Sequence, residues 1–176
     1  MELLLRKEIA ERIEVAMKEA GRQEIGGLLM GEHIAGETFR LVDITIQTLH
    51  GTHSTFERDP AQHQMQLDAF FQRTGADYER FNYLGEWHSH PSFEPLPSRT
   101  DMKTMQSIVG NPDVGVNFAV LIIARLAGRR RLALSATAFL KNGRPQAVGL
   151  IAENDGEELP RTLLQRLSAF LTSWRP

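Results

Sequence analysis

Cysteine is absent from all 176 residues of this chain. Its absence excludes disulfide bonds, cysteine-ligated zinc, thioester intermediates and thiol nucleophiles together. It also argues against the zinc-dependent nucleobase deaminases, which need a cysteine pair to hold their metal. Any hydrolysis that this chain catalyses must therefore use an oxygen nucleophile or a metal held by other side chains.

Long apolar runs and a strong excess of charge are missing as well. The first residues, "MELLL", are apolar, but Arg6, Lys7 and Glu8 follow at once, so we expect no signal peptide, no membrane anchor and a cytoplasmic location. The formal net charge is only −2, and the one basic run, Arg129 to Arg131, falls at an expected hairpin turn. Because this charge gives little general attraction for phosphates, we expect no nucleic-acid partner.

The composition that remains is that of an ordinary globular protein, with 41% hydrophobic and 24% charged residues. The length suits one domain with a sizeable core, so we predict a single domain over residues 1–176. Its core should cover about residues 1–150, and an amphipathic helix should follow at about residues 158–174.

Hydrophobic periodicity predicts alternating helices and strands. Helical spacing of apolar residues, with capping signals, predicts helices at about residues 5–20, 60–73, 98–109 and 158–174. Alternating or continuous apolar runs predict strands at about residues 24–34, 38–49, 81–88, 117–126, 132–140 and 147–151, the first two forming an antiparallel pair. This order indicates an α/β layered domain with a central sheet.

The stretch "GEWHSHPSFEPLPSRTD", from Gly85 to Asp101, has the composition of a metal site. His88 and His90 project from the same face of a strand, because strand side chains alternate with a period of two. Neutral imidazoles suit zinc, and a catalytic zinc takes three protein ligands and leaves one position open. Asp101, in the first turn of the following helix, could return over the strand end and complete the site.

A hydrolytic metal site also needs a group that accepts a proton from water and passes it to the leaving amine. Glu24 is the candidate, because it stands at the entrance to an apolar strand where the core pattern calls for no charge. Gly26 and Gly27 follow it, and such small residues allow another backbone to approach closely. Ser98 could donate its hydroxyl to the oxyanion that forms on the attacked carbonyl.

Each residue also has an ordinary interpretation. Ser98 and Asp101 form a helix-capping pattern, which is compatible with the catalytic interpretation. His88 and His90 could be surface or core residues, and Glu24 could be a solvated charge or a salt-bridge partner. The combination is far less ordinary: we expect it by chance in about one in a few thousand chains of this length.

The sequence closely resembles the JAMM (JAB/MPN) family of metallopeptidases, whose signature is a glutamate followed at long range by His-x-His-x7-Ser-x2-Asp. "EIGGLLMGE" supplies Glu24, and "HSHPSFEPLPSRTD" supplies His88, His90, Ser98 and Asp101 without a departure in spacing. The resemblance implies a JAMM/cytidine-deaminase-like layered fold, a central mixed sheet flanked by helices and a bound Zn2+. It also implies Glu24 as general base.

The activity implied by the resemblance is that of an isopeptidase cutting after the C-terminal glycine of ubiquitin or a ubiquitin-like protein. The short chain is similar to the stand-alone prokaryotic members, some of which accompany E1/E2-like conjugation enzymes in antiviral defence. The alternative is a non-catalytic scaffold of the same fold that binds ubiquitin-like proteins without cutting them. Such scaffolds typically lose metal ligands, whereas this chain keeps them all.

Three further features carry weaker expectations. Phe93, in the proline-rich loop, is a candidate for contact with the incoming peptide tail, with a buried loop anchor as the alternative. Trp87 is expected to pack in the core. The irregularly spaced His50, His53 and His63 are expected to be ordinary loop and helix residues rather than a second metal site.

Overall fold

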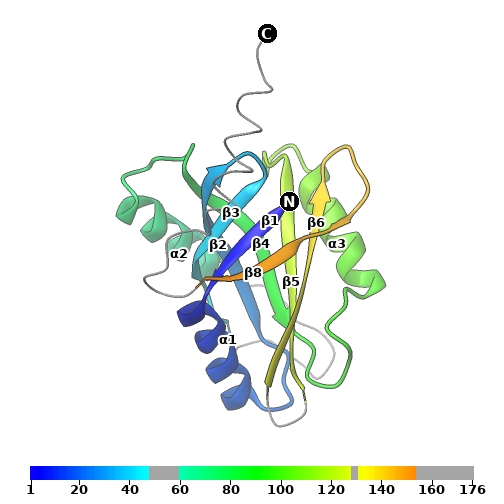
Figure 1. Cartoon of the computed structure of the whole chain (residues 1–176). Coiled ribbons are helices and arrows are strands. Elements are labelled where there is room, and N and C mark those ends of the chain that lie inside the picture. The colour runs from blue at the N-terminus through cyan, green and yellow to red at the C-terminus, as the bar shows by residue number, and fades with distance from the viewer. Residues whose placement is uncertain (48–59, 128–130, 154–176) are drawn as a thin grey trace.

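The structure is a computed structural model in which residues 1–47, 60–127 and 131–153 are described (Figure 1). Within these residues, three helices flank an eight-stranded sheet. The helices are α1 (Lys7–Ala20), α2 (Pro60–Arg73) and α3 (Arg99–Gly110). The strands are β1 (Glu2–Arg6), β2 (Gly26–Ala35), β3 (Thr38–Ile44), β4 (Phe81–Ser89), β5 (Phe118–Ala127), β6 (Arg131–Leu140), β7 (Gln146–Ala147) and β8 (Gly149–Glu153).

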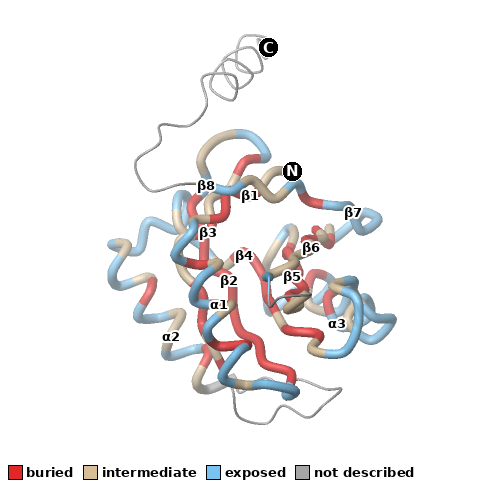
Figure 2. Tube along the Cα trace, turned by 60° about the horizontal axis from the view of Figure 1, so that its bottom comes forward, coloured by how far each residue is buried: buried red, intermediate tan, exposed pale blue. Residues whose placement is uncertain are grey.

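The sheet is mixed and strongly curved. Its strand order is β7-β6-β5-β4-β2-β3-β1-β8, with β4 parallel to β5 and β1 parallel to both β3 and β8. The two outermost strands, β7 and β8, are separated in the chain by Val148 alone. The sheet must therefore bend until its two edges meet, and the tube in Figure 2 shows this turn. At this junction, the Val148 N–H donates to the carbonyl of Ala136 on β6 at 3.0 Å.

Helix α1 packs against the inner face of this curved sheet. It buries Ile9, Ile13 and Met17, which recur at the spacing of one helical stripe. Trp87 of β4 lies in the same cluster with no exposed surface, and its Nε1 donates to the carbonyl of Thr45 at 2.9 Å. The expectation that Trp87 is a core residue is confirmed.

Helices α2 and α3 pack against the outer face. Helix α3 buries Met105 and Val109 against Leu121 and other outward-facing residues of β5 and β6. The outward-facing side of β4 lies beside α3, because Tyr83 packs against the same cluster. Phe81 shares that side by strand alternation and meets Phe70 of α2, with ring centroids 6.4 Å apart.

The expected α/β layered fold is confirmed, with one correction at the amino-terminal end. The helix expected from residue 5 begins at Lys7, and the residues before it form β1. Leu3, Leu4 and Leu5 are all buried, at 1%, 1% and 8% exposure. Three consecutive buried side chains suit a strand covered on both faces rather than one helical stripe. These residues form a strand because β3 and β8 pair with its two edges, and no local sequence pattern reveals such pairing.

The predicted strands and the helices before residue 110 otherwise agree with the structure within a few residues. The expected strand at residues 147–151 is divided into β7 and β8. The expected helix at residues 158–174 lies outside the described residues, as do His50 and His53. In the part of the chain that the structure describes, every helix is too short or too polar to span a lipid bilayer.

Candidate metal centre

The end of β4 carries two imidazoles on one face. His88 pairs with Ile123 of β5 and so shares the outward-facing side on which α3 packs. His90 lies just beyond the strand, where its N–H donates to the carbonyl of Ala124 at 2.8 Å and continues the ladder. The two Nε2 atoms are 3.2 Å apart. The predicted convergence of His88 and His90 is therefore present.

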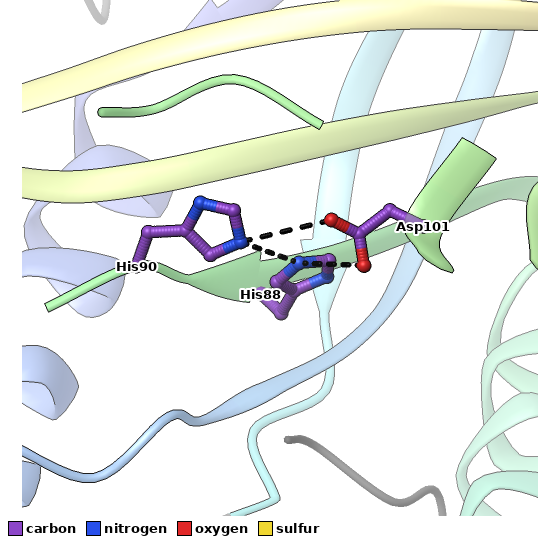
Figure 3. A group of neighbouring side chains, drawn as sticks. All are labelled: His88, His90 and Asp101. Atoms are coloured by element: carbon purple, nitrogen blue, oxygen red, sulfur yellow. Dashed lines mark hydrogen bonds and ion pairs between the residues drawn. The ribbon is translucent and has the colours of Figure 1, made fainter. Parts of the chain in front are cut away.

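Helix α3 brings a carboxylate to the same point, as Figure 3 shows. Asp101 Oδ1 lies 3.5 Å from His88 Nε2, and its Oδ2 lies 3.7 Å from His90 Nε2. Ser98 is the N-cap of α3, with its Oγ accepting from the Asp101 N–H and its own N–H donating to Asp101 Oδ2. The capping interpretation is thus correct, and the cap also holds the carboxylate over the strand end.

Burial alone would raise the pKa of Asp101. The hydrogen bond and charge of His88, together with the hydrogen bonds from Ser98, more than offset this effect and hold the pKa of Asp101 well below its usual value. The carboxylate is therefore ionised throughout the neutral range. An ionised carboxylate beside two imidazoles is a donor set suited to a divalent cation.

The separations between the donor atoms fit zinc. One ligand atom from each of His88, His90 and Asp101 can be chosen so that all lie within 4.8 Å of one another. Tetrahedral ligands at zinc–nitrogen bond lengths lie about 3.3 Å apart, close to the 3.2 Å between the two Nε2 atoms. Each Nε2 approaches a different oxygen of Asp101, at 3.5 and 3.7 Å. In residues 1–47, 60–127 and 131–153 this is the only such group of histidines and acidic residues, and His63 is not part of it.

Glu24 lies beside this group. It comes two residues before Gly26, which pairs with His88, so strand alternation places Glu24 on the same side of the sheet. It is only 6% exposed. Burial raises the pKa of Glu24; the charges of His88 and His90 oppose this rise and that of Asp101 adds to it. A carboxyl with a raised pKa takes up a proton more readily than a surface glutamate does.

The close backbone approach expected at the glycines after Glu24 is present. A Cβ on Gly27 would lie 2.1 Å from the carbonyl oxygen of Thr45, closer than any real side chain can come. The chain after β3 thus passes directly over this part of β2, and Gln47 forms a bridge to Gly26. Only glycine at position 27 permits this contact, which lies on the inner face of the sheet, opposite the face that carries the histidines.

A pocket of about 610 Å³ opens over the centre. All five residues expected at the site line it, namely Glu24, His88, His90, Ser98 and Asp101. Phe93 also lines the pocket and is 57% exposed, so the alternative of a buried loop anchor is wrong. Its ring meets that of His90 edge-on, with centroids 6.4 Å apart. Contact between Phe93 and a substrate stays a prediction.

Sequence reasoning missed two acidic residues of the pocket, Glu86 and Glu94. Glu86 lies two residues before His88 on β4 and is 8% exposed, with the Tyr83 hydroxyl donating to it at 3.3 Å. The same strand alternation that puts His88 and His90 on one face of β4 could have predicted Glu86 on that face. Glu94 contributes its carbonyl, which accepts from His90 Nδ1 at 3.1 Å. No sequence pattern predicts that contact.

A family model described as prokaryotic homologs of the JAB domain matches residues 6–135. The chain belongs to this family. The motif indicates a resemblance to the JAMM (JAB/MPN) family, and this match confirms it. The matched range begins at Arg6, the last residue of β1. It includes all three helices and every residue expected at the site.

Two curated relatives are similar to this JAB-domain chain over part of their length. A CD-NTase/cGAS isopeptidase from Enterobacter hormaechei is 35% identical over 109 residues, which cover 60% of this chain and 57% of the relative. The 26S proteasome regulatory subunit RPN11 from Encephalitozoon cuniculi is 32% identical over 84 residues, which cover 48% of this chain and 28% of the relative. The chain thus spans little more than half of the first relative and less than a third of the second.

The fold is also found in a solved structure, the solution structure of protein DSY2949 from Desulfitobacterium hafniense. The two superpose with a TM-score of 0.63 over 87% of the JAB-domain chain and 94% of the other, at 21% sequence identity. This likeness establishes the shared fold.

Proposed function

We propose that the protein is a zinc-dependent isopeptidase that hydrolyses the bond after the C-terminal glycine of ubiquitin or a ubiquitin-like protein. The observation that carries this proposal is the convergence of His88, His90 and Asp101 beside the buried Glu24 in one open pocket. Three protein ligands and an open side are the arrangement of a catalytic zinc site rather than a structural one. The isopeptidase named among the relatives supports the same reaction class.

In this proposal His88, His90 and Asp101 hold the zinc. When bound there, zinc supplies a Lewis acid that polarises the scissile carbonyl and makes water acidic enough to react near neutral pH. Glu24 accepts the proton of the attacking water and delivers it to the leaving amine. Its burial suits both steps, because a raised pKa brings the free energies of its charged and protonated forms closer together near neutral pH.

Ser98 has a hydrogen left for the substrate. Its Oγ accepts a hydrogen bond from the Asp101 N–H, so the hydroxyl hydrogen is not used in the cap. That hydrogen can point into the pocket, which Ser98 lines. We assign it to the oxyanion that forms on the attacked carbonyl.

The proposed substrate is an extended, glycine-ended tail. Such a tail can add a strand beside exposed main-chain groups, with small side chains near the scissile bond. Phe93, exposed at the pocket, is placed to contact it. Conjugation enzymes of the E1/E2 type would make the conjugates, and the Enterobacter relative's name suggests a CD-NTase as one modified protein. A cytoplasmic role in antiviral defence is the corresponding context.

The test is cleavage of a panel of ubiquitin-like proteins carrying short C-terminal extensions. Glu24→Gln should keep zinc but cut about 10²–10⁴-fold more slowly, and Asp101→Ala should lose zinc and activity together. Glu79→Gln is the control, because it removes the same charge at an exposed position, and it should cut at the wild-type rate. Equal rates for wild type and both site variants would exclude the assignment. A pure protein that never holds zinc, even when zinc is supplied, and cleaves none of the panel would support the scaffold alternative instead.

A further inference from the structure

The loop that follows the histidines is fastened to β5 at two neighbouring residues. At its start, the His90 N–H donates to the carbonyl of Ala124 at 2.8 Å. Four residues later, the carboxylate of Glu94 forms an ion pair and hydrogen bond with Nη1 of Arg125. The end of β5 therefore holds both sides of the turn between His90 and Glu94.

The register of the sheet explains why Arg125 can reach this turn. Ser89 pairs with Ala124, so the next step along both parallel strands brings His90 level with Arg125. Arg125 follows Ile123 at the strand period of two, and Ile123 packs on the side that faces α3. The guanidinium thus leaves the sheet on the same side as the imidazoles.

Glu94 is also the residue that orients His90. Its carbonyl oxygen accepts from His90 Nδ1 at 3.1 Å and from the N–H of Leu96 at 2.8 Å. A carbonyl oxygen can only accept, so Nδ1 of His90 must carry the proton. The neutral ring then has an unprotonated Nε2, which is the atom that faces His88 and Asp101.

We infer that Arg125 is a positioning residue for the metal site. By holding Glu94, it keeps the carbonyl of that residue against His90 Nδ1 and so fixes the tautomer and orientation of the zinc-binding ring. The role in zinc binding rests on the proposed function. The role in fixing the tautomer rests only on the hydrogen bonds of the folded chain.

A surface ion pair without function is the ordinary alternative. The Glu94 side chain is 74% exposed and that of Arg125 is 30% exposed, so their attraction is screened by water and adds little to folding stability. Arg125 Nε is buried and has no acceptor among the described residues, which weakens the folded state rather than strengthening it. Stability therefore gives a poor reason for the pair, whereas its link to His90 gives a specific one.

The first experiment measures zinc affinity by competition with a chromophoric chelator. We expect Arg125→Gln and Glu94→Ala each to weaken zinc binding about 10–100-fold, the usual effect of losing support behind a metal ligand. The double variant should bind zinc like either single variant, because both changes break one pair. Arg144→Gln is the matched control, because Arg144 is exposed in the turn after β6. Additive losses, or an affinity for Arg125→Gln within twofold of wild type, would overturn the role in zinc binding.

The second experiment needs no zinc. Nitrogen chemical shifts of the imidazoles, recorded on metal-free protein at slightly alkaline pH, report which ring nitrogen carries the proton. His90 should be protonated at Nδ1 in wild type and shift toward the Nε2-protonated form in Arg125→Gln. An unchanged tautomer in the variant would refute the inference. If the His90 tautomer changes in Arg125→Gln but wild type never binds zinc, the proposed function fails and the positioning by Arg125 stands.

Discussion

Ser98 and Asp101 hold each other at the start of α3. The Ser98 N–H donates to Asp101 Oδ2 at 2.7 Å, and the Asp101 N–H donates to Ser98 Oγ at 3.2 Å. The same carboxylate reaches both His88 and His90. One reciprocal pair therefore begins a helix and presents the candidate metal ligand.

Two substitutions of Ser98 should separate capping from catalysis. Ser98→Ala should lower the unfolding free energy by about 1 kcal/mol, whereas Ser98→Gly should lower it by only a few tenths of a kcal/mol. Both remove the hydroxyl, so both should lose about 10²-fold in cleavage rate if Ser98 donates to the oxyanion. Urea unfolding and a cleavage assay of each variant measure these effects. Ser107→Ala, at an exposed position of α3, is the control. If Ser98→Gly kept most of its cleavage rate while Ser98→Ala lost it, activity would depend on helix stability, and Ser98 would act only as a cap.

Zinc should stabilise the folded protein, because the ligands converge only after folding. At a free zinc concentration of 100 times its Kd, the unfolding free energy should rise by about 2.7 kcal/mol. A chelator should reverse the rise in Tm, and His88→Asn should abolish it. His33→Asn changes an exposed histidine near the far end of β2 and should leave the zinc response intact. A zinc response that survives His88→Asn would place the metal elsewhere.

Glu32 should make folding stability depend on pH. Burial would raise its pKa, but hydrogen bonds from Arg80 and Arg40 and their charges more than offset this, so the pKa of Glu32 is lowered on folding. The folded state then binds fewer protons than the unfolded state. The stabilisation is complete above the ordinary glutamate pKa and is lost as the pH falls through the lowered value.

Urea unfolding of Glu32→Gln over a pH series tests this relation. The variant should be less stable than wild type by about 2–3 kcal/mol at pH 7, because Arg80 loses the carboxylate it pairs with and Arg40 keeps only Glu153. The difference should shrink as the pH falls below the ordinary glutamate pKa of about 4.3. Glu79→Gln, at an exposed position, is the control and should keep the stability of wild type. A difference that is constant with pH would contradict the role of the Glu32 charge.

Gly85 should tolerate no side chain. Its φ of +147° is unusual for other residues, and a Cβ there would lie 1.9 Å from the carbonyl oxygen of Val120 on β5. Gly85→Ala should therefore lose about 3 kcal/mol or more, through strain and a forced separation of β4 from β5. Gly110→Ala, with no atom within 4 Å of its Cβ, should range from neutral to about 1 kcal/mol stabilising. Equal stabilities of the two variants, measured by urea unfolding, would contradict this packing.

The local parts of the fold could be predicted because their signals lie within a few residues. Helix α3 was placed by its cap and periodicity, and β4 and β5 by their apolar patterns. β1 was missed, since its five residues are a strand only because β3 and β8 lie on either side of it. The bending of the sheet to join β7 and β8 likewise follows from pairings between segments far apart in the chain.

At the candidate site, the sequence by itself determined which donor groups are available. The spacing of His88 and His90 put two imidazoles on one strand face, and the capping pattern put Asp101 at the start of a helix. Tertiary structure alone decided that this helix returns over the strand end, that Glu24 is buried beside the three candidate ligands, and that Arg125 pairs with Glu94 in the loop after His90. The physical reason is that strand and helix periods act between neighbours in the chain. Burial and charge pairing depend on which distant segments meet when the sheet curves.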